Sequence, residues 1–233
     1  MEVERLCGNK EQAIELSKTM NKIGKLAGKE TVCIITNMDE PLGKAVGNNL
    51  EVIEAIKALK GDMAKDIEEV VLELGAYMMK LAGVCENINE NKKKILENIK
   101  NGKAYNKFKE LVRKQGGDVS YLEDINKFEK AKFIIPVICN EDGYIEKINA
   151  RQVGEISGTL GAGRVKKEDV IDQSVGIILC KKVSNKVKKG DILCYVHANN
   201  EKLGNKAVSD LKDVYKISNE AIQRYNTIIE IIK

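Results

Sequence analysis

The chain of 233 residues has no tryptophan, three phenylalanines, one histidine and two prolines. Aromatic residues make up only 4% of it, and its lysines alternate with glutamates instead of forming a basic stripe. Nucleic-acid sites combine a basic stripe with neighbouring aromatic residues, so we expect no nucleic acid among its partners. The 39 basic and 35 acidic residues nearly cancel, leaving a net charge of +4.

Long hydrophobic runs and cysteine pairs are also missing. No apolar run approaches the roughly 18–20 residues that a membrane span needs, so we expect no membrane partner. None of the six cysteines forms a Cys-x-x-Cys pair, and Cys33, Cys139, Cys180 and Cys194 lie in apolar runs, as small buried hydrophobic residues do. With no recognisable signal peptide, we expect a soluble protein with reduced thiols in the cytoplasm.

The first half of the chain predicts helices and a single strand. Apolar residues at three- and four-residue intervals predict helices at 11–27, at about 48–60, at 65–81 and, in two segments, at 89–115. The apolar run at 31–36 predicts a buried strand. One strand cannot form a sheet, and the chain supplies no obvious partner for it. We therefore expect this strand to have an exposed edge that is prone to association.

The composition changes near residue 130. Apolar runs predict strands and two short helices in the second half; the strands lie at 131–139, 144–148, 175–183, 192–197 and 227–232, and the helices at about 150–159 and 200–216. Strand-rich segments with one or two helices are typical of a separate α+β domain. We place the boundary between Gly117 and Lys130, which divides the chain into domains 1–125 and 126–233.

Two features of the second half could bind ligands, and each has an ordinary structural interpretation. The run Gly158-x-x-Gly161-x-Gly163 could contact phosphate, but it neither follows a clear strand nor opens a Gly-Lys-Ser/Thr helix, so a turn is favoured. His197 ends an apolar strand and could act as a base near neutral pH, but no Ser or Cys partner can be assigned to it. A structural hydrogen bond is favoured there, and no zinc site is expected.

The segments 142–146, 175–177 and 187–193 are similar to the barrel-sandwich of biotinyl and lipoyl carrier domains. Those carriers present a modifiable lysine within Met-Lys-Met or Asp-Lys-Ala, and neither tripeptide occurs here. The pattern therefore favours the shape of such a domain without its carrier chemistry.

The best-marked stretch of the chain is Thr36–Ile56, in which a predicted strand is followed by a glycine-bearing loop and a helix. Such loops are where α/β proteins place ligands. The Pro41-Leu-Gly43 turn exposes backbone carbonyls, Asn48 or Asn49 could cap the helix, and the helix offers the carboxylates of Glu51 and Glu54. Carbonyls with one carboxylate suit a hard, weakly charged cation such as potassium. A glycine turn before an ordinary helix is the structural alternative.

The motifs of the chain, taken in order, closely resemble those of the pyrimidine-nucleoside phosphorylases, including thymidine phosphorylase. The resemblance covers about residues 10–233. It is carried by the segments Met38–Asn48, Leu50–Ile56, Leu59–Gly61, Leu74–Gly75, Gly116–Asp118, Leu160–Arg164, Lys167–Asp169, Ile171–Asp172, Val175–Ile177, Val187, Lys189–Gly190 and His197.

The resemblance implies reversible phosphorolysis, in which phosphate attacks a pyrimidine nucleoside to give free base and (deoxy)ribose 1-phosphate. It implies a homodimer and a mixed fold, in which the later part of a Rossmann-like α/β domain precedes a C-terminal α/β hammerhead domain of barrel-sandwich type. It also implies part of a potassium site, with backbone carbonyls from Leu42 and Ala45 and the carboxylate of Glu54.

The chain also departs from the family pattern. Family members are nearly twice as long, and their N-terminal half carries a phosphate-binding Lys-His-Ser segment, a glycine-rich loop and the residues that hold the pyrimidine. None of these can be mapped here, so no catalytic or substrate-binding residue is assigned. Asn37 and Glu40 stand where Asp and Gln are usual. We therefore expect a truncated or split phosphorylase that is inactive alone; the alternative is a non-catalytic binding or scaffold module that keeps the hammerhead domain.

Overall fold

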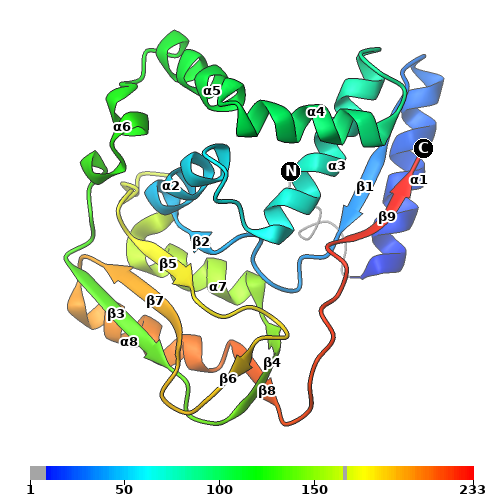
Figure 1. Cartoon of the computed structure of the whole chain (residues 1–233). Helices are drawn as coiled ribbons and strands as arrows, with labels where there is room; N and C mark the ends of the chain where they lie inside the picture. Colours follow the sequence, from blue (N-terminus) through cyan, green and yellow to red (C-terminus); the bar gives the residue numbers. More distant parts are fainter. Residues whose placement is uncertain (1–8, 165–166) are drawn as a thin grey trace. The chain divides into compact units, whose positions relative to one another are not determined.

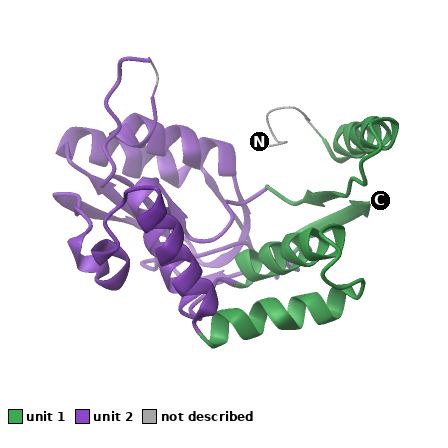
Figure 2. Cartoon of the chain, turned by 90° about the horizontal axis from the view of Figure 1, so that it is seen from above, with its two compact units in different colours: residues 1–38, 65–101, 225–233 green, residues 39–64, 102–224 purple. Residues whose placement is uncertain are grey.

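The computed structural model describes residues 9–164 and 167–233, which form two compact units. Figure 2 colours them separately: unit 1 draws on residues 1–38, 65–101 and 225–233, and unit 2 on 39–64 and 102–224. Cys7 lies outside the described residues. Each unit combines segments that are distant in sequence, and the division into domains at residues 125 and 126 stays a prediction.

In unit 1, a long helix and a two-stranded sheet combine an early segment of the chain with its last strand. Helix α1 (Lys10–Leu26) begins at Asn9, whose side chain accepts a hydrogen bond from the backbone N–H of Gln12 at 2.9 Å. Strand β1 (Cys33–Thr36) pairs antiparallel with β9 (Ile228–Ile232), and both strands contact α1. Figure 1 shows this pairing of the first and last strands. The expectation that strand 31–36 lacks a partner was therefore wrong, because its partner is the last strand of the chain.

The rest of unit 1 is a helix pair, α3 (Lys65–Leu81) and α4 (Ile88–Lys100), at the predicted positions. A buried polar side chain connects the two helices. Asn91 is fully buried, and its Nδ2 donates to the carbonyls of Ala76 at 3.1 Å and Cys85 at 2.8 Å. These bonds fix α4 against α3 and the turn that joins them.

Unit 2 contains two antiparallel sheets. The larger has the order β2-β5-β7-β3, with bounds Ala45–Val46, Gly176–Leu179, Ile192–Ala198 and Phe133–Ile138. The smaller has the order β6-β4-β8, with bounds Lys186–Val187, Gly143–Ile148 and Tyr215–Ser218. The strands β3 and β4 are neighbours in sequence but belong to different sheets, so no hairpin forms at the turn between them.

Helices surround these sheets. Besides α2 (Asn48–Leu59), unit 2 contains α5 (Lys103–Lys114), α6 (Ser120–Glu123), the 3-10 turn η2 (Ile125–Lys127), α7 (Ala150–Ser157), the π-helical turn η3 (Gly158–Ala162) and α8 (Glu201–Lys212). Helix α8 packs on β3 and β7, and α7 contacts β2 and β5. One apolar core fills the unit, and its fully buried members include Val137, Ile145, Val153, Ile177 and Leu211.

The prediction of a mixed α/β fold is confirmed, with antiparallel sheets in both units. Among the described residues, no helix is both long enough and apolar enough to cross a membrane. Cys139 and Cys194 are buried as expected. Cys180 is exposed, contrary to the prediction, because β5 ends at Leu179 and the chain turns away from the core there.

Candidate functional site

The loop formed by residues 40–47, called here the carbonyl loop, is placed by strand β2 in the large sheet of unit 2. Ala45 is in register with Ile178 of β5, and Val46 with Ile177. Two glycines allow this contact: Gly47 has φ 143° and Gly176 has φ 152°. A Cβ on Gly176 would lie 2.3 Å from the carbonyl oxygen of Val46. Only glycine permits both the positive φ and the close backbone approach.

Glu54 reaches back from α2 to the carbonyl loop. Its Oε1 accepts a hydrogen bond from the backbone N–H of Lys44 at 2.8 Å, and its Oε2 accepts one from Ala45 at 3.0 Å. Glu51, one turn earlier, accepts from the backbone N–H of Gly47 at 2.9 Å. Glutamates in the first turns of α2 thus satisfy the backbone donors of the loop that precedes the helix.

The three residues that the sequence analysis assigned to potassium therefore lie in one short segment. Glu54 contacts Ala45 directly, and Leu42 lies in the same loop, 37% exposed. Within residues 9–164 and 167–233, no three His, Cys, Asp or Glu side chains form a cluster suited to a metal ion. A cation in this part of the chain would depend on backbone carbonyls, which suit potassium better than a transition metal. The assignment of these ligands stays a prediction.

Asn48 and Asn49 do not cap α2 with their side chains. The N-cap is Gly47, without a side-chain bond. The side chain of Asn48 instead donates to the carbonyl of Ala162 at 2.9 Å, and the backbone N–H of Asn49 donates to Gln173 at 3.0 Å. The start of α2 is thus attached to the segment that follows α7, which sequence reasoning did not anticipate.

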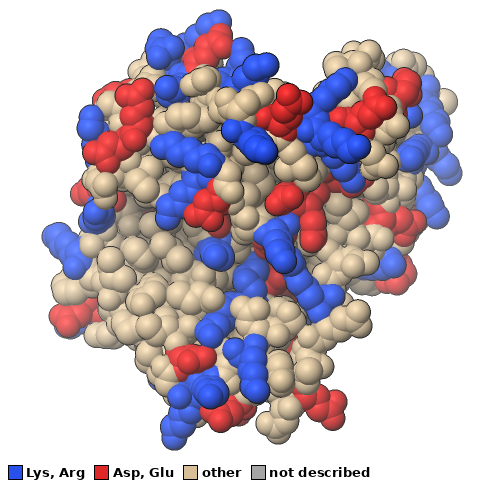
Figure 3. All heavy atoms as spheres, viewed as in Figure 1, with Lys and Arg blue, Asp and Glu red and all other residues tan. Residues whose placement is uncertain are grey.

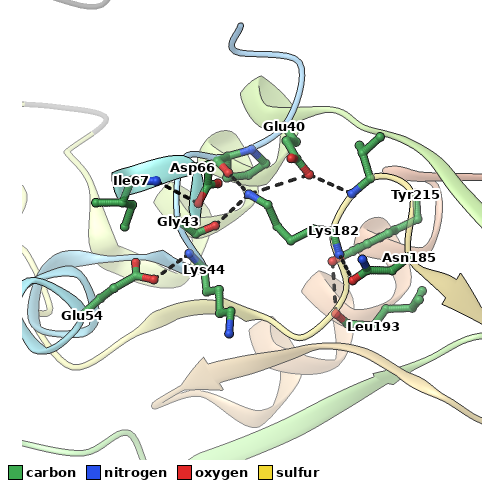
Figure 4. Close-up of polar contacts among 12 residues, drawn as sticks. Glu40, Gly43, Lys44, Glu54, Asp66, Ile67, Lys182, Asn185, Leu193 and Tyr215 are labelled. Carbon is green, nitrogen blue, oxygen red and sulfur yellow. Dashed lines mark hydrogen bonds and ion pairs between the residues drawn. The ribbon is translucent and has the colours of Figure 1, made fainter. Parts of the chain in front are cut away.

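A lysine from the turn after β5 completes the carbonyl loop (Figure 4). The ammonium of Lys182 donates to the carbonyl oxygens of Pro41 and Gly43, the latter at 2.8 Å. It lies 3.7 Å from a carboxylate oxygen of Glu40, which also accepts the backbone N–H of Val183 at 2.8 Å. The side chains of Lys182 and Glu40 are each only 17% exposed. No motif in the sequence indicated this contact.

Charge on the visible face of the molecule is mixed. Figure 3 shows Lys and Arg side chains interspersed with Asp and Glu across that face. Ion pairs such as Lys181 with Asp191, at 3.0 Å, and Lys216 with Glu146, at 3.1 Å, neutralise neighbouring charges. Neighbouring charges of opposite sign weaken the net field on this face.

The structure places both features of the second half that could bind ligands, the glycine run and His197. The glycine run forms the π-helical turn after α7, where Gly161 has φ 108° and its carbonyl accepts from the N–H of Asp172 at 2.9 Å. His197 lies on β7, in register with Ile134 of β3 and Gly176 of β5. Burial lowers the pKa of His197, so the neutral imidazole is the favoured form near pH 7.

Comparisons with known proteins find a matching family model for each part of the chain. Residues 3–105 match the family model of the glycosyl transferase family a/b domain, and residues 144–218 match the pyrimidine nucleoside phosphorylase C-terminal domain. The pyrimidine-nucleoside phosphorylase of Bacillus subtilis (strain 168) is 43% identical over 211 residues, which are 91% of this chain and 48% of the relative. That of Geobacillus stearothermophilus is 43% identical over 188 residues, which are 81% of this chain and 43% of the relative. In both parts the chain is similar to the pyrimidine-nucleoside phosphorylases, and it spans about half the length of the curated relatives it matches.

Proposed function

We propose that residues 1–233 form the C-terminal portion of a cytoplasmic pyrimidine-nucleoside phosphorylase, which splits thymidine- or uridine-type nucleosides with phosphate. The observation that carries the proposal is the 43% identity to the Bacillus subtilis enzyme over nearly the whole chain. The carbonyl loop adds support. Its strand β2 pairs with β5, so residues 39–64 and the C-terminal strands belong to one compact unit.

The proposal includes a requirement for the other half of the fold. Phosphorolysis needs cations to hold phosphate and donors to stabilise the negative charge on the departing base. The family takes these from an N-terminal region with a Lys-His-Ser segment, and no such tripeptide occurs in the 233 residues. Residues 1–233 alone therefore do not catalyse the reaction, and assembly as a homodimer belongs to the complete enzyme.

The proposal also assigns a potassium ion to the carbonyl loop, with the carbonyls of Leu42 and Ala45 and the carboxylate of Glu54 as its ligands on this chain. Hard oxygen donors of this kind fit potassium. When bound, the ion would supply positive charge that favours an anionic substrate such as phosphate. The residues of this chain hold the loop: Glu54 binds its backbone N–H groups, and Lys182 binds two of its carbonyls.

The test is phosphate-dependent release of thymine or uracil, followed by chromatography. The purified chain is assayed alone and after co-expression with the N-terminal portion of the Bacillus subtilis relative that it does not match. We expect no turnover alone and phosphate-dependent turnover in the complemented sample, reduced by Glu54→Gln. Turnover by the chain alone would refute the need for a second half. A folded complex without turnover would instead favour the non-catalytic scaffold.

A further inference from the structure

We infer that Lys182 is a positioning residue for the candidate cation site: its ammonium holds the carbonyl loop in the conformation that directs the neighbouring carbonyl of Leu42. The inference rests on the proposed potassium site and adds a residue that is not one of the predicted potassium ligands. It follows from the contacts of Lys182 within unit 2.

The first step is that Lys182 binds two carbonyls separated by one residue. Its ammonium carries three donors, and the carbonyls of Pro41 and Gly43 occupy two of them. Each peptide group is planar, so binding a carbonyl oxygen fixes the orientation of the whole group. The peptide groups that follow Pro41 and Gly43 are therefore both fixed. The carbonyl of Leu42 belongs to the peptide between them, and its direction is set from both sides.

The second step is that the contact is shielded and neutralised. The side chains of Lys182 and Glu40 are each 17% exposed, and their charged atoms lie 3.7 Å apart. Removing one partner of such a pair leaves the other charge poorly solvated, which is costlier than breaking a pair in water. Glu40 in turn accepts the N–H of Val183 at 2.8 Å, so side chain and backbone of the 182–183 segment both bind the loop.

The third step is that Glu54 fixes the next part of the same loop. Its carboxylate accepts the N–H groups of Lys44 and Ala45, while the carbonyl of Lys44 accepts from the N–H of Leu179 at 2.7 Å. Lys182 and Glu54 thus determine the backbone on either side of the Gly43–Lys44 bond. Gly43 has φ 71°, and because glycine is free to adopt many other conformations, the loop depends on these contacts to keep this one.

A potassium ion responds to this shape because carbonyl ligands bind through directed oxygen lone pairs. Partners that orient ligands of a metal change its affinity by about 10–100-fold when they are removed. We therefore expect Lys182→Met to weaken monovalent cation binding by about tenfold or more. Lys182→Arg keeps a charged donor of similar length and is expected to recover part of the affinity.

The experiment measures thallium(I), a spectroscopic substitute for potassium, binding to the full chain by ²⁰⁵Tl NMR, together with hydrogen exchange of the loop amides. The variants are Lys182→Met, Lys182→Arg and, as the matched control, Lys181→Met. Lys181 is the neighbouring lysine, pairs with Asp191 at 3.0 Å and contacts a different turn. Circular dichroism confirms folding of each variant.

The expected result is faster exchange at the amides of Lys44 and Ala45 and weaker thallium binding in Lys182→Met alone, with partial recovery in Lys182→Arg. Unchanged exchange in Lys182→Met would overturn the inference. Faster exchange with unchanged thallium affinity would also overturn it, because Lys182 would then brace the loop without positioning the ion. If the unaltered chain binds no thallium, Leu42, Ala45 and Glu54 do not form a cation site by themselves, and the exchange measurement alone decides whether Lys182 holds the loop.

Discussion

Replacing Gly176 by alanine tests the closest backbone contact behind the carbonyl loop. A Cβ at this position would lie 2.3 Å from the carbonyl oxygen of Val46 and 3.0 Å from Cα of Gly47. The obstacle is backbone and cannot rotate away, so β2 must move by a large part of an ångström. Because β2 carries the carbonyl loop into the sheet, this displacement reaches the candidate cation site.

The magnitude has two parts. A positive φ costs an L-residue roughly 1–2 kcal/mol. Overpacking against backbone adds about 1–3 kcal/mol. Gly176→Ala should therefore lower the free energy of unfolding by about 2–5 kcal/mol. Gly190→Ala is the matched control, because Gly190 also has positive φ, +97°, but nothing lies within 4 Å of an added Cβ. Gly190→Ala should lose only the roughly 1–2 kcal/mol that a positive φ costs.

The assay is urea unfolding followed by circular dichroism at the helical band, since the chain has no tryptophan to report by fluorescence. The midpoint and slope yield the free energy of unfolding for each variant. We expect Gly176→Ala to be clearly less stable than Gly190→Ala. Equal losses in the two variants would show that β2 and β5 do not approach each other as closely as described.

Three further predictions concern titratable side chains. Burial opposes ionisation of Asp172, but hydrogen bonds from Asn199, at 2.7 Å, and its neighbours lower its pKa overall. Asn199→Ala should raise that pKa and lower the free energy of unfolding by about 1–3 kcal/mol near pH 7. A lowered carboxyl pKa stabilises the fold only above the pKa of the unfolded state, so the difference measured by urea unfolding should shrink in acid. A difference that does not change with pH would contradict this prediction. Burial lowers the pKa of His197, so the unfolded chain binds its proton first and stability should fall as the pH drops below about 6.5. His197→Gln should remove that component from urea midpoints measured across this range, and parallel pH profiles would refute the assignment. Burial raises the pKa of both thiols, that of Cys194 to about 12, but only the Cys180 side chain is exposed. Iodoacetamide should therefore alkylate Cys180 first in the native protein, as mapped by peptide mass, and equal labelling of both would count against the buried position.

Much of the fold could be predicted because it depends on local patterns. The helix at 65–81 has its predicted bounds, and the two segments predicted at 89–115 are the separate helices α4 and α5. Apolar residues at helical spacing face one side whatever surrounds them, so the sequence alone is sufficient there. The order of motifs was also sufficient to recognise the resemblance to the family, which the comparisons confirmed.

The candidate site was only partly predictable. Glu54 was chosen for its place after the Pro-Leu-Gly turn, and it does contact the loop. Lys182 was missed, since the bond to Gly43 joins residues far apart in sequence and one lysine among 39 basic residues carries no local signal. Asn48 was misassigned as a cap because an asparagine at a helix start usually has that role. Here its side chain instead donates a hydrogen bond to a carbonyl that is distant in sequence.

The amino-acid sequence by itself determined most of the helices and strands, the mixed fold class and the family that this protein resembles. Only the tertiary structure decided that the first strand pairs with the last, that the carbonyl loop joins the C-terminal sheet, and that Lys182 binds it. The physical reason is the range of the interactions. Helix periodicity arises between residues three or four apart, whereas strand pairing and buried ion pairs depend on which distant segments fold together.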